Sequence, residues 1–549
     1  MVSNLISFFN KIRTRLRRLL GDAATSAFIL HNRAVFSRPK NSAIYKREVL
    51  IELNSMHSAH IAYGYLGNVL AERDDAIIKC YLPLPRKTWL QRLAFAVDQL
   101  FGSRELGVFN SFGSQACLVP NLSAKQCVWA QKLYDQTVSG LKTIQDVEDL
   151  TIDGVWIGDL VYDTYLMTCK QPTIDIAAAD FRRVLKTSLD LFVFWQEYIT
   201  PARVSAINVS HCVYIQAIPL RIGVKKGIPV FQSGVTHVYR LDERNLFAYN
   251  DFLFFPERFA ALPKDVQIAG LAEAELRVNR RFSGEVGVDM SYSTKSAYGD
   301  FKKSRLIKES PRKKILIATH CFFDSPHGYG NNLFPDFYQW LEFLGQLTKV
   351  TDYDWYIKTH PDFLPGTKEI IDTFAVKYPK FTLLPADSSH HQLIAEGINF
   401  ALTVLGTIGF EYAALGIPVI NASVNNPHIA YDFNFHPKSV QEYRVLLMNL
   451  DTLELKIDKT QVYEYYFMAR IFNTQNLFFD DYEATIDAIS GYDSQFTPRA
   501  YEQWLAQWSP AKHQNLLSAL KRFVSSGDFR MDYRHQALEF SVQPLGANF

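Results

Sequence analysis

Two long stretches of the chain repeat the same alternation of a short apolar run and a longer run with helical spacing. The first stretch opens at Arg47 and the second at Lys314. Such alternation is typical of parallel sheets flanked by helices, because two parallel strands need a crossover connection between them. The sequence therefore predicts an α/β fold with two Rossmann-like domains, and a length of 549 residues fits two or three domains.

The expected elements divide the chain into five parts. In an N-terminal domain, 45–275, strands are expected at 49–53, 76–82, 204–209 and 228–232. In a second domain, 313–450, they are expected at 314–319, 355–358, 381–384, 400–405 and 418–421. The polar, basic stretch 276–312 is the expected connection, and 451–549 is an expected helical tail that packs on both domains.

Composition excludes several classes of protein. A net charge of +2 argues against a nucleic-acid-binding protein, because such proteins usually carry a strongly basic balance. The six cysteines lack the paired spacing of a zinc site, and we interpret them as reduced thiols of a cytoplasmic protein. No window approaches the about 18 consecutive apolar residues that a membrane-spanning helix needs.

The first 21 residues have a character of their own. Apolar residues recur at helical spacing among five basic residues, with no acid before Asp22: Lys11, Arg13, Arg15, Arg17 and Arg18. This pattern predicts an amphipathic helix, 1–21, in an anionic membrane interface, where each basic side chain adds about 1 kcal/mol. We expect a protein held peripherally on the inner face of the cytoplasmic membrane. The alternative is a helix docked on its own domain.

The first candidate site follows the expected strand at 355–358, in the run TyrIleLysThrHisProAsp. Lys358 ends the strand and His360 lies in the loop beyond it, where ammonium and imidazole groups can meet a phosphate. Pro361 disfavours helical geometry for His360 and keeps it extended. The alternative is a turn that only ends a strand.

A second candidate site lies in 402–423, which reads as a buried strand, a tight turn, a helix and another strand. Gly406 allows the turn, and Thr407 opens a helix whose free amides and positive dipole end favour an anion. Glu411 lies one turn into that helix, where a ribose or sugar hydroxyl would be within its reach. The alternative is an ordinary strand-helix-strand unit.

The order of these motifs, HisPro, then GlyThrIleGlyPheGlu with AlaLeuGlyIleProValIle, then AsnAsnProHisIleAlaTyr, resembles the C-terminal domain of bacterial capsule and lipopolysaccharide glycosyltransferases of the GT-B fold. The resemblance covers 311–443, and this part of the chain is similar to CMP-Kdo transferases. It implies two domains that face each other across a cleft, and a transfer reaction that uses neither a metal nor a cofactor. The implied donor is a CMP-Kdo-like or UDP-sugar compound, and the implied acceptor is a lipid-linked glycan or an oligosaccharide of capsule or O-antigen synthesis. It also implies donor binding by six residues: Lys358, His360, Pro361, Gly406, Thr407 and Glu411.

Two alternatives remain beside this interpretation. The chain resembles, more loosely, CDP-polyol phosphotransferases of teichoic-acid synthesis. Those enzymes and many sialyltransferases place paired serines where this chain has Gly406 and Thr407, so the base and the sugar of the donor stay open. The second alternative is a non-catalytic scaffold of a polysaccharide assembly complex that keeps the fold.

Candidates for catalysis lie in both halves of the chain. In the second domain, the loop 320–332 carries His320, Asp324 and His327. These side chains are candidate polar contacts of the cleft or metal ligands, and the alternative is a loop with a structural role only. In the first domain, Asp159 and Asp163 share a helical face, so that one is a candidate general base or nucleophile. We favour Asp159, because Gly158 permits a turn that would expose it; capping or solvated carboxylates are the alternative.

Two histidines of the first domain are candidate acceptor contacts. His57 follows an expected strand and precedes a helix, where a capping turn explains it equally well. His237 also follows a strand, and a structural turn is its alternative.

Overall fold

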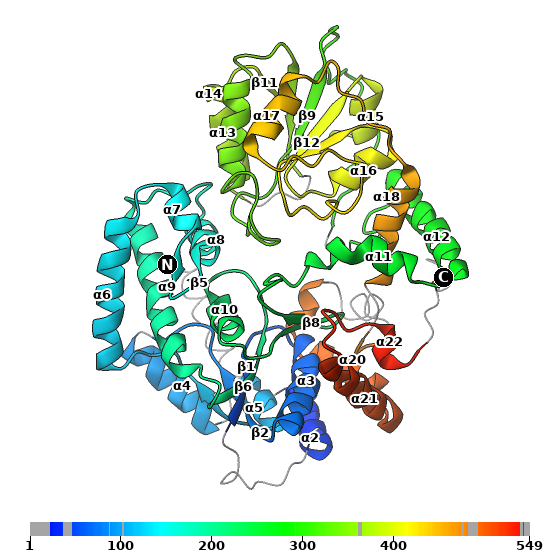
Figure 1. Ribbon diagram of the computed structural model, residues 1–549. Helices are drawn as coiled ribbons and strands as arrows, with labels where there is room; N and C mark the ends of the chain where they lie inside the picture. The colour runs from blue at the N-terminus through cyan, green and yellow to red at the C-terminus, as the bar shows by residue number, and fades with distance from the viewer. Residues whose placement is uncertain are drawn as a thin grey trace, which may run out of the picture.

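The computed structural model describes residues 22–36, 47–86, 88–101, 104–290, 293–360, 365–473, 477–480, 492–538 and 542. The expected membrane helix at 1–21 and Pro361 therefore lie outside the described residues. Two sheets, each covered by helices, occupy the lower and the upper half of Figure 1. None of the helices in the described part of the chain combines the length and apolarity needed to span a bilayer.

The first sheet has six strands in the order β3-β2-β1-β6-β7-β8. Their bounds are β1 (Arg47–Glu52), β2 (Ala76–Tyr81), β3 (Ser114–Leu118), β6 (Val204–Val209), β7 (Val230–Ser233) and β8 (Val238–Leu241). All neighbours pair in parallel except β7 and β8, which are antiparallel. The strand order reverses between β1 and β6, and a two-stranded hairpin, β4 (Thr151–Ile152) with β5 (Val155–Trp156), lies apart from the sheet.

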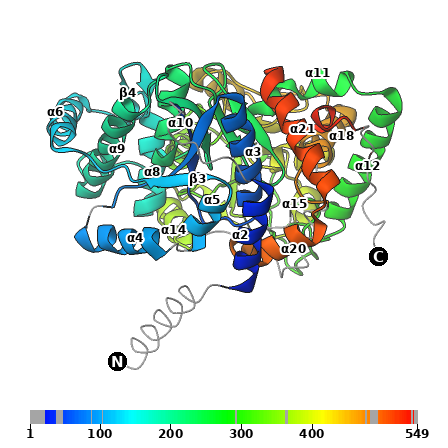
Figure 2. The ribbon, with the colours of Figure 1, turned by 90° about the horizontal axis from the view of Figure 1, so that it is seen from below.

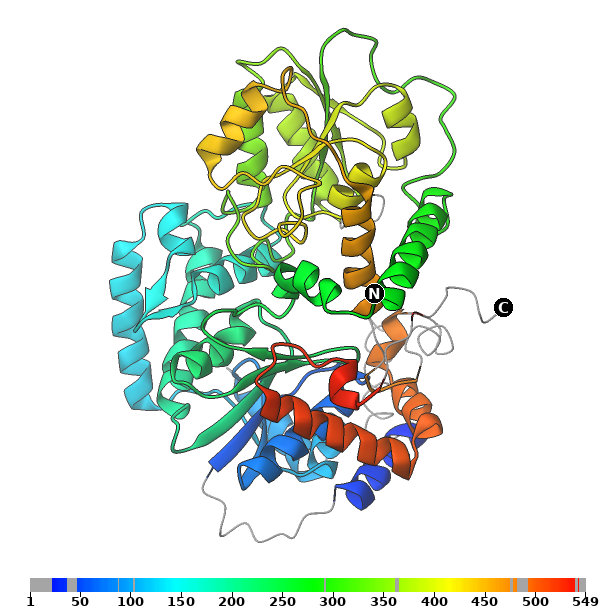
Figure 3. The same ribbon diagram turned by 45° about the vertical axis from the view of Figure 1, so that its right-hand side comes forward.

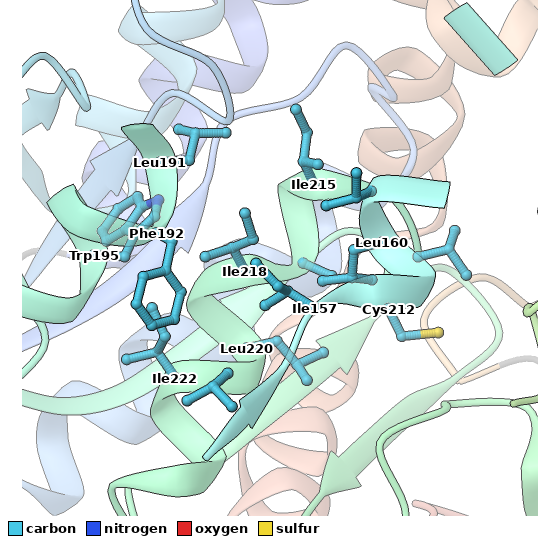
Figure 4. Packing of buried hydrophobic residues seen from close by; sticks show 14 of the residues in the cluster. Ile157, Leu160, Leu191, Phe192, Trp195, Cys212, Ile215, Ile218, Leu220 and Ile222 are labelled. Carbon is cyan, nitrogen blue, oxygen red and sulfur yellow. The ribbon is translucent and has the colours of Figure 1, made fainter. Parts of the chain in front are cut away.

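Helices cover both faces of this sheet. One group is α6 (Ala124–Gly140), α7 (Ile144–Glu148), α8 (Gly158–Cys169), α9 (Ala179–Tyr198), the short η1 (Ile215–Ala217) and α10 (Ile218–Lys225). Figure 4 shows how α8, α9 and α10 fill their core with Leu160, Trp195 and Leu220, all of them buried. The other group is α2 (Ala23–Val35), α3 (Ala59–Arg73) and α5 (Arg104–Ser111), which share a second apolar cluster. Helix α4 (Trp89–Phe101) lies at the outer edge of the domain.

The second sheet has five parallel strands in the order β11-β10-β9-β12-β13. Their bounds are β9 (Lys314–Ala318), β10 (Asp354–Lys358), β11 (Phe381–Leu383), β12 (Phe400–Thr403) and β13 (Val419–Asn421). Helices α13 (Phe337–Leu347), α14 (Thr367–Lys377) and α17 (Val440–Met448) bury one face, and α15 (His390–Ala395) and α16 (Ile408–Ala414) bury the other. The two parallel sheets with their crossover helices confirm the predicted two-domain Rossmann-like fold.

The connection between the sheets is shorter than expected. After η2 (Asn250–Phe254) and α11 (Phe255–Ala260), helix α12 (Lys264–Phe282) runs into the first part of 276–312, the stretch predicted as a polar connection. Its basic residues are engaged in ion pairs: Arg277 binds Glu273 at 2.7 Å and Asp289 at 2.8 Å. Charge clustering indicated a linker, but Glu273 and Arg277 have the four-residue spacing of a helical ion pair, and only the pairing with Asp289 depends on the fold. Between 283 and 313, with 291–292 undescribed, the chain forms no helix or strand.

The chain returns to the first sheet after the second (Figure 3). Helix α18 (Lys459–Tyr466), continued by η3 (Phe467–Phe472), packs against α12 and α16. After η4 (Tyr492–Phe496), helices α20 (Arg499–Gln507) and α21 (Pro510–Ser526) pack against α2 and α3, and α22 (Tyr533–Gln536) packs against α21. Backbone bonds between Met531 and Val238 and between Arg240 and Phe529 attach the last segment to β8.

Candidate functional site

Each sheet has one point where its strand order reverses, and ligands of open parallel sheets bind beyond the carboxyl ends of the strands at such points. In the first sheet this point lies between β1, which ends at Glu52, and β6, which is followed by Ser210. In the second sheet it lies between β9, followed by His320, and β12, which ends at Thr403. These two edges define the candidate site.

His320 is fixed at the edge of the second sheet. Its Nε2 atom accepts the backbone N–H groups of Val404 and Leu405, at 3.2 and 3.4 Å, and lies 3.0 Å from the hydroxyl of Thr403. Burial lowers the pKa of His320 to about 3, and the nearby charge of His360 acts in the same direction. His320 is therefore a neutral side chain that holds the loop after β12, with its ring stacked on Phe337 at 4.5 Å.

Gly406 leaves room beside His320. A Cβ atom at this position would lie 2.7 Å from the Thr403 hydroxyl and 3.2 Å from Cε1 of His320. The expected turn is present: the amide of Gly406 donates to Thr403 Oγ1, and its carbonyl accepts from Gly409. Close approach to His320, rather than an unusual backbone angle, is the physical reason for glycine here.

Lys358 ends β10 as expected, and only 3% of it is exposed. Burial lowers the pKa of Lys358 to about 8, and the charges of Glu411 and Asp387 oppose that shift. Among the described residues, the ammonium group of Lys358 has no hydrogen bond or ion pair. His360, two residues further along the chain, is exposed. The edge of the second sheet thus holds a buried cation that lacks a directly bound anion within the described chain.

Glu411 does not have the predicted role of contacting a ribose or sugar hydroxyl. Its Oε1 atom accepts two bonds from Arg281, at 2.9 and 2.6 Å, and its Oε2 atom accepts the hydroxyl of Tyr298 at 2.8 Å. Burial would raise the pKa of Glu411, but the charge and hydrogen bonds of Arg281 outweigh it and lower the pKa. The first turn of α16 faces inward, so Glu411 holds α16 against the end of α12 instead of facing a sugar.

The sequence analysis missed three members of this cluster: Arg281, Tyr298 and His390. His390 opens α15, is buried, and binds the hydroxyl of Tyr412 through Nδ1 at 2.8 Å. Burial and the neighbouring Lys358 hold its pKa well below the ordinary value. The polar run SerSerHisHis at 388–391, shortly after an expected strand, was the available signal for it.

Glu52 is the feature of the first sheet's edge that the sequence analysis missed. Its two carboxylate oxygens accept the amide of Ser210 at 2.9 Å and the hydroxyl of Ser210 at 2.6 Å. Burial raises the pKa of Glu52 from 4.5 to about 7, although the Ser210 bonds oppose this shift. An acid inside an otherwise apolar run, ValLeuIleGluLeu, was the signal, and its place at the reversal point came only from the strand order.

The two expected acceptor histidines lie in different surroundings. The half-buried ring of His57 lies 5.1 Å from Tyr501 of α20 and 5.5 Å from His60. His237 packs beside Tyr239 at 5.2 Å, and burial, reinforced by Arg530, lowers its pKa to about 3. Both rings thus contact segments or charges that come from the C-terminal tail.

The sequence predicts an exposed Asp159 at the start of α8. In the structure its side chain is buried. Its carboxylate binds Arg221 at 2.5 Å, and the guanidinium also lies over the ring of Trp156. The reason is Gly158: a Cβ atom there would lie 2.1 Å from the carbonyl oxygen of Glu148, so the glycine allows α8 to pack closely instead of turning outward. This buried ion pair explains Asp159 without a catalytic role.

Asp163 and the loop 320–332 join the two domains. His327, expected to line the cleft, is fully buried, with Nδ1 2.6 Å from Asp163 and Nε2 3.4 Å from Glu148. Burial opposes charging, but the two carboxylates raise the pKa of His327 well above its ordinary value. Asp324 remains exposed and accepts the hydroxyl of Tyr214, a residue that follows β6, at 2.8 Å.

The structure therefore separates the catalytic candidates. His320 lies with Lys358 and His360, Asp324 bridges the two sheet edges through Tyr214, and Asp159 and Asp163 are held inside the protein. Within the described ranges, no group of three or more His, Cys, Asp or Glu side chains has a geometry that could hold a metal ion.

No protein-family profile and no curated protein match this sequence. Among solved structures, the chain is similar to a β-Kdo 2,4 transferase, KpsC of Thermosulfurimonas dismutans, at 10% identity over 48% of this chain and 79% of the other, with a TM-score of 0.30. It is also similar to a UDP-GlcNAc 2-epimerase of Neisseria meningitidis, at 13% identity over 78% of this chain and 95% of the other, with a TM-score of 0.19. A sialyltransferase of Photobacterium damselae matches at 9% identity over 78% of this chain and 98% of the other, with a TM-score of 0.16. At such scores these likenesses assign neither a family nor an activity to this chain.

Proposed function

We propose that this protein is a glycosyltransferase that moves a sugar from a nucleotide-activated donor to a lipid-linked glycan of a bacterial surface polysaccharide. The observation that carries the proposal is Lys358, a buried ammonium group without an ion pair among the described residues, at the carboxyl edge of a parallel sheet. A buried charge is costly unless an opposite charge compensates it. A donor phosphate next to Lys358 provides that charge.

The surroundings of Lys358 fit a phosphate. The exposed His360 and the loop at Gly406 and Thr407 lie at the same edge, and the loop leads into α16, whose first amides add a favourable dipole. A charge-assisted hydrogen bond from such a group contributes about 1.5 to 3 kcal/mol. The motif order of 356–431, which resembles capsule and lipopolysaccharide glycosyltransferases, supports a CMP-Kdo-like or UDP-sugar donor.

The first sheet supplies the acceptor side of the reaction. An acceptor hydroxyl oxygen attacks the anomeric carbon, the bond from that carbon to the donor phosphate breaks, and the nucleotide leaves with the electron pair. Glu52 takes the hydroxyl proton, because it lies at the reversal point of the first sheet and its pKa of about 7 suits a general base at neutral pH. Lys358 and His360 stabilise the charge of the leaving nucleotide.

Two other functions are distinguished by their products. A CDP-polyol phosphotransferase would form a phosphodiester bond instead of a glycosidic bond. A non-catalytic scaffold would release no nucleotide at all. The basic, apolar sequence of 1–21 supports a place at the inner membrane surface, where lipid-linked acceptors lie.

The test compares donor binding in the wild-type protein, Lys358→Met and Lys368→Met. Lys368 is an exposed lysine of the same domain and serves as the matched control. CMP-, UDP-, GDP- and CDP-activated compounds are screened by thermal shift, since a ligand at about 100 times its Kd stabilises the folded state by about 2.7 kcal/mol. We expect one donor class to stabilise the wild type and the control but not Lys358→Met. Stabilisation of all three proteins, or of none, would contradict the proposal.

A further inference from the structure

Helix α4 exposes an apolar face to solvent. Trp89 is 70% exposed, Leu90 is 59% exposed and Leu93 is 54% exposed, and Val97 is exposed as well. A spacing of four residues places Trp89, Leu93 and Val97 on one stripe of the helix, and Leu90 lies beside it. Contiguous apolar surface of this kind marks an interaction site rather than scattered surface residues.

The helix is fixed so that this face points outward. A reciprocal pair of bonds at its start, between Thr88 and Gln91, forms a capping box, with both distances at 3.2 Å. On the inner side Phe95 is buried, and the guanidinium of Arg86 lies 5.8 Å from its ring centre. The exposed stripe is therefore not the result of a frayed helix, because the opposite side is anchored.

The charges around the stripe fit an anionic surface. From Leu84 to the end of α4 at Phe101 the sequence contains three basic residues, Arg86, Lys87 and Arg92, and one acidic residue, Asp98, so the balance is basic. Arg92 is exposed on α4. Tryptophan beside basic residues is the composition of helices that lie in the interface of a bilayer.

The described chain begins on the same side of the protein as α4. The basic, apolar segment 1–21 joins α2 at Asp22, and α2 packs against α5, which directly follows α4. Figure 1 places α2 and α4 on the side of the first domain that faces away from the second sheet, and Figure 2 draws them along one side of the molecule. Helix α4 thus lies on the side of the first domain where the described chain enters α2.

We infer that α4 docks on an anionic phospholipid bilayer, with Trp89, Leu90, Leu93 and Val97 in the interface. A second copy of the chain is a poorer occupant, because a stable protein interface takes about 20 to 30 residues a side and this stripe offers four large side chains. The inference deepens the proposed function by naming the surface that holds its lipid-linked acceptor. It is tested without donor or acceptor, so that its failure and a failure of the proposed function are distinguishable.

The experiment measures binding of the full-length protein to vesicles of phosphatidylcholine with phosphatidylglycerol and to vesicles of phosphatidylcholine alone. The test variant is Trp89→Glu with Leu93→Glu. The control variant, Val128→Glu with Val376→Glu, carries the same change at two valines that are more exposed still but lie on α6 and α14. We expect the test variant to bind anionic vesicles at least tenfold more weakly than the wild type, and the control variant to match the wild type.

A second measurement does not depend on the fold of the charged variant. In Trp89→Phe the helix keeps its apolar face but loses one fluorophore, so brominated lipids should quench less of its tryptophan emission than in the wild type. Equal vesicle affinity of the test and control variants, or equal quenching in Trp89→Phe, overturns the proposal. A wild type that is dimeric by light scattering and becomes monomeric only in the test variant, with unchanged vesicle binding, would assign the stripe to a second copy.

Discussion

Glu52→Gln tests the chemistry of the first sheet's edge through stability as well as through activity. The pKa of Glu52 lies at about 7 in the folded protein, against 4.5 for the ordinary side chain, chiefly because the carboxyl group is buried. A difference of this size corresponds to about 3 kcal/mol between the two protonation states. Ionised Glu52 therefore costs the folded protein about 3 kcal/mol at high pH.

The direction of the pH dependence follows from proton binding. Between pH 4.5 and 7 the folded state binds more protons at Glu52 than the unfolded state, so its free energy of unfolding falls as pH rises. Below that range Glu52 is neutral in both states, and above it the full cost is present. The glutamine side chain of the variant cannot ionise, so the stability of the variant relative to the wild type should rise by about 2.5 kcal/mol between pH 5 and 8.

One structural effect of the substitution is independent of pH. Oε2 of Glu52 accepts the amide of Ser210, and a glutamine keeps this bond through its carbonyl oxygen only if the Ser210 hydroxyl turns to accept its NH₂ group, a rearrangement whose cost does not depend on pH. The slope of the stability difference with pH, and not its absolute value, is therefore the informative quantity.

The assay is urea unfolding of the full-length protein, followed by tryptophan fluorescence at several pH values from 5 to 8.5. Glu243→Gln, an exposed glutamate of the same domain, is the control and should run parallel to the wild type. Turnover of Glu52→Gln should fall by about 10² to 10⁴ with donor affinity unchanged, because positioned proton transfer is lost. Parallel stability curves for the wild type and Glu52→Gln would refute the reasoning on burial, and undiminished turnover would refute the role as general base.

Three further predictions address the other parts of the chain. His360→Ala should weaken donor binding about tenfold to a hundredfold by calorimetry, since a charge-assisted bond is lost, and unchanged affinity would remove His360 from the site. Asp159→Asn should lower the free energy of unfolding by about 3 to 5 kcal/mol in thermal or urea melts, because it leaves the buried charge of Arg221 unpaired; a variant as stable as the wild type would contradict the ion-pair interpretation. Deletion of 1–21 should weaken co-sedimentation with anionic vesicles, with α4 as the remaining attachment, while turnover of a soluble acceptor analogue persists; equal sedimentation of both forms would favour a helix docked on the protein.

Sequence reasoning located the strands and the loops that follow them. The strands around Lys358 and Thr403 are short apolar runs bounded by polar residues, and such runs are decided by neighbours in the chain. Because ligands bind beyond the carboxyl ends of parallel strands, the same reasoning led to Lys358, His360 and Gly406 as candidates. The end of helix α12 was assigned to the connection because its basic residues cluster there, although Glu273 and Arg277 have the four-residue spacing of a helical ion pair.

What the sequence alone determined is therefore local: the alternation of strands and helices, the two sheets, and the glycine, lysine and histidine residues at strand ends. The tertiary structure decided which of these polar groups are already occupied. Arg281 and Glu411 are 130 positions apart, and Asp163 and His327 are 164 apart, yet each pair is in direct contact. Such contacts depend on how separate elements pack. The partner that packing supplies then sets whether a buried carboxylate is an ion-pair partner, like Asp159 beside Arg221, or a candidate proton acceptor, like Glu52 beside Ser210.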